Sequence, residues 1–310
     1  MITYFILHRN RPYFLEANVN AIRKYFPEDT YIVVLDDGSY DFIRDKIVEL
    51  PIDDFVGIDQ WNEKSCCRLL HRAINSKINS EFVMFSEDDF LFCPSMIEVK
   101  KENAKGEFLF DPVYEFYVGL YNNASRIIED SMELLRRRED IRMLQLSRPV
   151  KDNVFYTEKV LATRACNWKI LAHRKMPHYY YTNWPYMMRT EDFRSIKCPT
   201  EGRIEDFEIT VSSWLNKSFG SGDWAMCPER PYYFHIGYAF SLQSEMNERR
   251  QSARQDLLRL IGVKNDVSWE KVIKKLCMLW AESKFHLDLS PNCDLQGNMI
   301  YSFIHLKGKI

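Results

Sequence analysis

The sequence lacks any long apolar run. Nowhere do its 310 residues approach the roughly eighteen uninterrupted apolar positions that a membrane-spanning helix needs. The apolar stretch at residues 1–7 is also too short for the core of a signal peptide. These absences predict a chain without a membrane span that works in the cytoplasm, or in the host cytoplasm if the chain is viral.

The eight cysteines include no Cys-x-x-Cys pair, and the adjacent Cys66 and Cys67 fit neither a zinc knuckle nor an ordinary disulfide framework. We therefore expect buried, reduced thiols. Glycine and proline are scarce, with 11 and 12 residues, and hydrophobic residues make up 46% of the chain. This composition excludes a low-complexity or disordered chain and predicts one that folds throughout.

Neither sign of charge dominates, because 42 Lys and Arg residues stand against 44 Asp and Glu residues, for a net charge of −2. Such a balance argues against a protein that wraps nucleic acid through an overall positive field, although it allows a local basic face. The run Arg136-Arg137-Arg138 lies on an expected helix, where a solvated surface is its ordinary interpretation, and it would matter for function only if the acceptor were polyanionic.

Apolar runs of strand length alternate with segments of helical periodicity through the first third of the chain. Strands are expected at residues 2–7, 30–35, 56 and 81–85, and helices at 13–25, 40–50 and 66–75. This alternation predicts an α/β fold with a mainly parallel sheet and covering helices. Beyond residue 100 we expect a helix at 124–138, a strand at 141–146, a polar segment to about residue 205, and then more helix.

Three acidic residues, Glu87, Asp88 and Asp89, follow directly on the apolar strand at residues 81–85. Neighbouring buried carboxylates repel one another unless a cation neutralises them, and ligand sets made only of oxygen select hard ions such as Mg²⁺ or Mn²⁺. A solvated acidic turn is the alternative interpretation. Because the preceding strand is so apolar, we favour a metal site.

Two other polar clusters follow apolar strands in the same way. Asp36 and Asp37 lead into Gly38 and Ser39, where glycine permits a tight turn, and the segment 8–11, His-Arg-Asn-Arg, follows the first strand. In open α/β sheets ligands collect at the carboxyl ends of the strands. We therefore expect all three clusters to line one crevice.

Together, residues 5–26, 31–39 and 67–95 resemble the nucleotide-binding half of the GT-A glycosyltransferases, particularly the family 2-like group. The resemblance implies a GT-A fold, a nucleotide-sugar donor, of which a UDP-sugar is the first expectation, and a Mn²⁺ or Mg²⁺ cofactor. It implies that the donor is contacted by His8, Arg9, Asp36, Asp37, Glu87 and Asp88, with Arg68 or Arg72 nearby. Asp89 is the first choice as metal ligand, with Asp88 beside it. Because Ser86 stands where the family often has an aspartate, the choice of Glu87 or Asp88 as the ribose contact stays open.

Two later segments extend the resemblance. Glu205 and Asp206 match the Glu-Asp element that opens a helix near the acceptor and supplies the general base in inverting members; Asp206 is the preferred base and Glu205 the second. Favourable placement of acidic residues at a helix N-terminus is the alternative, and Glu191 with Asp192 is a rival pair. His235 resembles the late histidine that completes the metal shell or meets the diphosphate.

The resemblance implies an enzyme, a metal-dependent transferase of hexosyl or pentosyl groups that is expected to be inverting. Two acceptors stay open, a saccharide or lipid-linked sugar and 5-hydroxymethylcytosine in phage DNA, as in phage-type DNA-modifying transferases. The other classes are a nucleotidyltransferase and an inactive sugar-binding relative. We expect a glycosyltransferase domain at 1–240, with a nucleotide-binding half at 1–95 and an acceptor half at 96–240, and a C-terminal helical appendage at 241–310.

Overall fold

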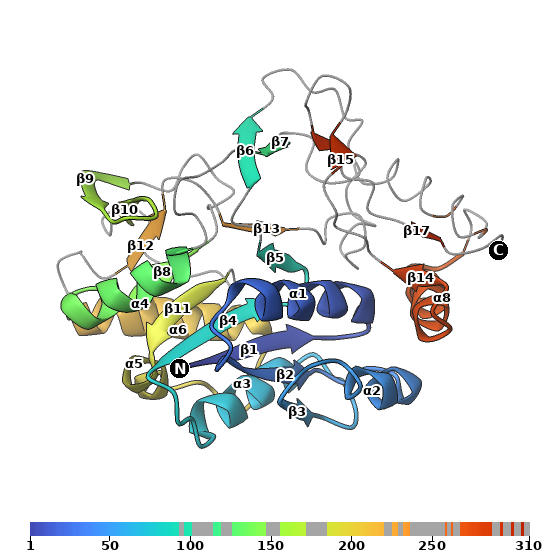
Figure 1. Cartoon of the computed structure of the whole chain (residues 1–310). Helices are drawn as coiled ribbons and strands as arrows, with labels where there is room; N and C mark the ends of the chain where they lie inside the picture. The colour runs from blue at the N-terminus through green and yellow to red at the C-terminus, as the bar shows by residue number, and fades with distance from the viewer. Residues whose placement is uncertain are drawn as a thin grey trace.

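The computed structural model describes residues 1–92, 96–100, 114–118, 126–146, 156–171, 185–219, 225–228, 232–235, 258, 262, 267–286, 292–293, 299–300 and 305–306. These residues build a nine-stranded sheet with helices on both faces (Figure 1). In spatial order its strands are β3 (Asp54–Gly57), β2 (Tyr31–Asp36), β1 (Ile2–His8), β4 (Phe82–Glu87), β11 (Tyr186–Arg189), β8 (Met143–Gln145), β12 (Ala225–Pro228), β10 (Asn167–Leu171) and β9 (Tyr156–Ala162).

The helices are α1 (Pro12–Tyr25), α2 (Asp41–Ile47), α3 (Ser65–Asn75), α4 (Ile127–Arg137), α5 (Thr190–Ser195), α6 (Ile204–Phe219) and α8 (Trp269–Ala281). Four small antiparallel pairs accompany the sheet: β5 (Phe90–Phe92) with β13 (Tyr233–His235), β6 (Met96–Lys100) with β7 (Tyr114–Val118), β14 (Phe285–His286) with β17 (His305–Leu306), and β15 (Asn292–Cys293) with β16 (Met299–Ile300).

The first four strands are parallel, and β11 and β10 are the strands of the sheet that run against the others. This arrangement confirms the predicted α/β class with a mainly parallel sheet. The register pairs His8 with Asp36 and Leu7 with Glu87. The polar turns after β1, β2 and β4 therefore leave the sheet at the same edge.

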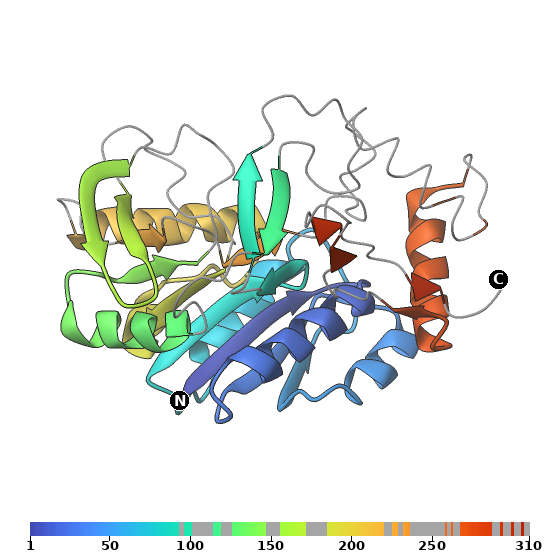
Figure 2. The ribbon, with the colours of Figure 1, turned by 45° about the horizontal axis from the view of Figure 1, so that its top comes forward.

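Strand β1 is central because its alternate side chains enter two different cores. Ile2, Tyr4 and Ile6 belong to a cluster with α1, α4 and α8, whereas Phe5 belongs to a second cluster with α3, α5 and α6. Figure 2 shows α1 running alongside β1. A strand buried on both faces is mainly apolar, as residues 2–7 are apart from Thr3, whose hydroxyl accepts a hydrogen bond from the Ser80 hydroxyl at 2.8 Å.

Helix α1 begins where a sequence signal favours it, with Pro12 at its first turn, and its buried side chains pack on the sheet. Helix α8 packs in turn against α1. The Trp280 indole donates to Glu16 at 2.9 Å and the Cys277 thiol lies 3.1 Å from the Asn10 carbonyl oxygen. The segment predicted as a helical appendage thus supports the turn after β1, and its described part also contains β14 to β17. The domain boundary at residue 240 stays a prediction.

The largest addition to the predicted elements lies between residues 147 and 205, for which we expected a polar segment and named no strand or helix. This stretch contains β9, β10, β11 and α5. Strand β9 carries polar side chains because it is an edge strand, and Val160 in it is 57% exposed. Strand β11 has only four residues, too few for a periodic pattern. Among the described residues, no helix is long and apolar enough to cross a membrane.

Candidate functional site

The turns after β1 and β2 are held together by Asn10. Its backbone, at φ +51°, is in the left-handed region that asparagine tolerates. Its backbone N–H donates to Ser39 Oγ at 2.9 Å, and its side-chain oxygen accepts from the Tyr40 N–H at 2.9 Å. Two segments about thirty residues apart are thereby fixed as one polar wall.

The buried side chain of Asp36 stabilises this wall. Its side chain is fully buried and accepts hydrogen bonds from the Ser39 backbone at 3.0 Å, from the Ser39 hydroxyl, and from Arg44 Nε at 3.0 Å. The buried carboxylate is therefore balanced by a cation and a closed turn. Its proposed contact with a nucleoside stays a prediction.

Asp37 and Arg9 face each other beside the same turn. The Ser65 hydroxyl at the start of α3 donates to Asp37, and burial raises the pKa of the Asp37 carboxyl. Burial lowers the pKa of Arg9, while the charge of Asp37 opposes that change. The Arg9 guanidinium also lies 3.8 Å from the centre of the Trp61 ring. This stacked pair is a flat, partly exposed surface of the type that can receive an aromatic base.

Gly38 makes the approach of Trp61 possible. Its φ of +77° is in the left-handed region, and an added Cβ would lie 2.6 Å from the Trp61 backbone nitrogen. Glycine is needed here both for its backbone conformation and for its missing side chain.

The acidic cluster after β4 is contacted by two basic side chains of the turn after β1, of which Arg11 is the permanent positive charge. His8 Nδ1 lies 2.8 Å from Asp88 Oδ2, and both side chains are fully buried. The Arg11 guanidinium contacts Asp88 Oδ1 and Asp89 Oδ2, each at 2.5 Å. One guanidinium thus bridges two neighbouring carboxylates, through a hydrogen bond to Asp89 and an ion-pair contact with Asp88.

Glu87 has a different environment from its two neighbours. Burial, and next the negative charge of Asp89, raise the pKa of Glu87 to about 8. Glu208 on α6 adds to this effect, which places a fourth carboxylate near the cluster. The predicted triplet therefore differs in role: Asp88 and Asp89 are ion-paired, and Glu87 holds a proton more readily.

A divalent cation fits this edge only in part. No group of three or more metal-ligating side chains is found in the part of the chain that the structure describes. Two carboxylates with a donor diphosphate are nevertheless a sufficient ligand set for Mg²⁺ or Mn²⁺. Asp88 and Asp89 fit that role provided that Arg11 releases them.

The predicted histidine, His235, reaches the same region through its backbone. Strand β13 pairs with β5 so that His235 lies opposite Phe90, the residue after Asp89. The side chain of His235 lies outside the described residues, so its role as a metal ligand stays a prediction. One residue pair nearby is described, the hydroxyls of Tyr4 and Tyr233, which are 2.9 Å apart.

The two arginines predicted on α3 are engaged away from the acidic cluster. Arg68 forms an exposed ion pair with Glu201 at 2.9 Å, and Arg72 donates to the Gly57 carbonyl at 3.3 Å. Gly57 ends β3 beside Asp36. Through its contact with the Gly57 carbonyl, Arg72 therefore lies near the sheet edge at which β2 ends.

Glu205 and Asp206 open α6 at the same sheet edge, because the Gly202 carbonyl before them accepts from the Cys67 N–H of α3. Both side chains are exposed. Asp206 Oδ2 accepts from the Arg203 backbone N–H at 2.8 Å, which is a helix-capping contact. Burial raises the pKa of the Cys66 thiol, and the negative charges of Asp37, Glu87 and Glu205 raise it further. Glu205, Asp37 and Glu87 therefore all lie within electrostatic range of Cys66.

The rival pair lies elsewhere. The Thr190 N–H that opens α5 donates to the Glu81 carbonyl, just before β4 begins, whereas the acidic cluster follows the other end of that strand. Asp192 is held there by Arg142 at 2.8 Å and Arg189 at 2.9 Å. A six-residue strand spans roughly 17–20 Å, so Asp192 is far from the acidic cluster.

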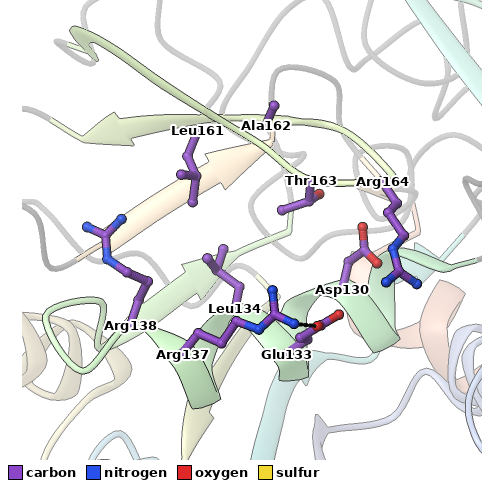
Figure 3. A pocket seen from close by; sticks show the side chains of 9 residues that line it. All are labelled: Asp130, Glu133, Leu134, Arg137, Arg138, Leu161, Ala162, Thr163 and Arg164. Carbon is purple, nitrogen blue, oxygen red and sulfur yellow. Dashed lines mark ion pairs between the residues drawn. The ribbon is translucent and has the colours of Figure 1, made fainter.

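The predicted basic run does not form a cationic face. Arg136 pairs with Glu81, Arg137 with Glu133, and Arg138 with Asp140. Two of these arginines line a cavity of about 450 Å³ between α4 and the turn joining β9 to β10 (Figure 3). Asp130 and Glu133 line it as well, so its charge is mixed.

Four residues of the site were missed from the sequence, Arg44, Trp61, Ser65 and Glu208. Asn10 and Arg11 were placed at the crevice with the segment 8–11 but were given no role of their own. Arg11 lies within the predicted polar turn, but its pairing with carboxylates 77 and 78 positions away leaves no local pattern. Glu208 had a usable signal, because it follows Glu205 by three positions and therefore shares its helix face.

No protein-family model and no curated protein matches the sequence. Solved structures similar to this chain include the S. aureus protein TarS, residues 1–349, at 13% identity and TM-score 0.45, covering 90% of this chain and 72% of that one. A mannosyltransferase from Pyrobaculum calidifontis in complex with GDP-Man and Mn²⁺ has 13% identity and TM-score 0.42, covering 90% and 71%.

Glucosyl-3-phosphoglycerate synthase from Mycobacterium tuberculosis, in complex with Mg²⁺ and UDP, has 13% identity and TM-score 0.45, covering 86% of this chain and 81% of that one. At such scores and identities the similarity carries no argument about this chain. Its function has to be inferred from its own residues.

Replacement of Gly38 by alanine is expected to destabilise the protein by more than the roughly 1–2 kcal/mol that the left-handed conformation alone costs, because the new Cβ would overlap the Trp61 backbone. Urea unfolding measures this change. Gly262→Ala is the matched control, since Gly262 has φ +68° and no described atom lies within 4 Å of the added Cβ. Equal losses in the two variants would contradict the steric explanation.

The raised pKa of Glu87 predicts a pH-dependent stability. A carboxyl whose folded-state pKa exceeds its unfolded value of 4.5 contributes stability below that value, and this contribution is lost as pH rises to about 8. The free energies of unfolding of the metal-free wild type and of Glu87→Gln should therefore diverge between pH 4.5 and 8. The wild type should become less stable relative to the variant by about 1.4 kcal/mol per unit of pKa shift. Parallel pH profiles would show that Glu87 titrates normally.

Proposed function

We propose that this chain is a GT-A glycosyltransferase that moves a sugar from a nucleoside diphosphate donor, first of all a UDP-sugar, to an acceptor hydroxyl. The observation that carries the proposal is the convergence of the polar turns after β1, β2 and β4 at one sheet edge. Strand order reverses between β1 and β4, since β2 and β3 follow on one side and β4 lies on the other. Such switch points are where α/β sheets bind nucleotides.

The wall around Asp36, Asp37 and Gly38 suits the nucleoside. Asp37 offers a carboxylate for ribose hydroxyls, and the stacked pair of Arg9 and Trp61 offers a flat face to the base. His8 and Arg72 would act from the same edge. Side chains placed in this way would select a nucleoside by stacking on its base and by hydrogen bonds to its polar groups.

The acidic side of the edge suits the diphosphate. Asp88 and Asp89 would hold a divalent cation, with His235 as a further ligand. A Mn²⁺ or Mg²⁺ ion bound there would stabilise the negative charge that develops on the leaving diphosphate. Glu87 would contact the ribose or donor sugar as a protonated or ionised carboxyl, according to pH.

The first turn of α6 suits the acceptor side, because Glu205 in this turn lies within electrostatic range of Cys66, as do Asp37 and Glu87. Asp206 would take the proton from the acceptor hydroxyl as that oxygen attacks the anomeric carbon, giving inversion. Glu205 is the second candidate. A saccharide is the proposed acceptor, since the arginine run that could favour DNA is ion-paired.

Thermal unfolding with nucleotides tests the donor site. A nucleoside diphosphate that binds the native state should raise the melting temperature by a few degrees in the presence of Mn²⁺, and Asp89→Asn should abolish the rise. Asp192→Asn is the matched control, a buried ion-paired aspartate near the other end of β4 that should keep it. Absence of a shift with every nucleotide would refute the donor site, and release of pyrophosphate on turnover would identify a nucleotidyltransferase instead.

The general base is tested by Asp206→Asn, which keeps an acceptor for the Arg203 N–H and so should preserve the helix cap. We expect kcat to fall by about 10²-fold or more with little change in melting temperature. Glu205→Gln and Glu208→Gln serve as controls on the same helix. If one of these variants lost activity while Asp206→Asn kept it, the base would be reassigned to that residue.

A further inference from the structure

Arg11 occupies the position between the two carboxylates that a cation would need. On Asp88, His8 takes Oδ2 and Arg11 Nη2 takes Oδ1; on Asp89, Arg11 Nη1 takes Oδ2. Asp88 and Asp89 would hold the cation, and Asp88 Oδ1 is the oxygen of Asp88 that His8 does not contact. That oxygen is already 2.5 Å from the guanidinium.

The guanidinium is a permanent positive charge in this place. Arginine keeps its proton in proteins, so the contacts with Asp88 and Asp89 are contacts with a full charge. The two carboxylates are 0% and 3% exposed, so little water is available to screen them. Arg11 is therefore a strong counter-charge, and a second cation on the same oxygens would be repelled by it.

The side chain of Arg11 can move without its backbone. The Arg11 carbonyl accepts hydrogen bonds from the Phe14 and Leu15 N–H groups at 3.0 and 3.2 Å, which anchors the residue at the start of α1. The side chain is 20% exposed, unlike the carboxylates it holds. A rotation of this side chain alone would therefore release the carboxylates and leave the start of helix α1 in place.

We propose that Arg11 is an internal counter-cation that competes with the divalent cation for Asp88 and Asp89, so that metal binds as the guanidinium leaves. This inference rests on the proposed function, because it concerns the cation of the same donor site. The exchange keeps the buried carboxylates neutralised in both states, by Arg11 before the metal binds and by the metal afterwards. It also makes the metal affinity of the free protein lower than two buried carboxylates would otherwise give.

Direct Mn²⁺ titration in the absence of nucleotide tests this competition, by calorimetry and by the electron paramagnetic resonance signal of free Mn²⁺. Arg11→Met removes the charge at similar length, and we expect it to bind Mn²⁺ at least about tenfold more tightly than the wild type. Arg11→Lys should be intermediate, because an ammonium cannot hold two carboxylates as a planar fork does.

Arg44→Met is the matched control. Arg44 is 17% exposed and pairs with the fully buried Asp36, so its loss also breaks a buried ion pair, but one outside the acidic cluster. Its Mn²⁺ affinity should equal that of the wild type. A gain in Arg44→Met as large as in Arg11→Met would overturn the proposal, because the effect would then come from general loosening.

Unchanged or weaker Mn²⁺ binding by Arg11→Met also overturns the proposal, as does a failure of wild type and variant alike to bind Mn²⁺. If Arg11→Met does not fold, Arg11→Lys decides in the same way: tighter binding supports competition and unchanged binding refutes it. Failure of the proposed function would be recognised separately, since it concerns nucleotide binding and turnover and the metal titration contains no nucleotide.

Discussion

The parallel pairing of β1 with β2 and β4 is the constraint on which the rest of the molecule depends. Because β1 is hydrogen-bonded on both sides and buried on both faces, its register is determined by the cores it enters. A shift of one residue would exchange the side chains of Tyr4 and Phe5 between two packed layers. The same register sets His8 beside Asp36 and Leu7 beside Glu87, so the packing of the core also positions the polar turns.

The electrostatics of the site follow from that placement. Four aspartates, Asp36, Asp37, Asp88 and Asp89, are buried at one edge, and burial of charge is costly unless it is compensated. The turn after β1 contributes much of the compensation through Arg9 and Arg11, with a hydrogen bond between His8 and Asp88, and α2 adds Arg44. The carboxylates at this edge therefore stay ionised and buried, in a state that could bind a ligand accompanied by a cation.

Segments far along the chain then support the turn. Helix α8 contacts Asn10 through Cys277 and α1 through Trp280, while the segment before α6 docks on the start of α3. The late parts of the chain therefore stabilise the loop geometry of the early part. Loops held by a rigid scaffold in this way are suited to binding and catalysis.

The sequence by itself determined the alternation of strands and helices up to residue 92, the mainly parallel sheet and the position of Asp36, Asp37 and the acidic triplet at strand ends. These features are local, because burial of a strand on both faces demands an apolar run and the chain must turn where that run stops. The strands between residues 156 and 189 lacked such a signal, since they are short or lie at an edge. The partners of each charge were decided only by the tertiary structure: Arg11 meets Asp89 across 78 positions, and Asp192 is separated from the site by the length of β4. Ion pairs between distant segments depend on sheet order and strand direction, which no local periodicity encodes.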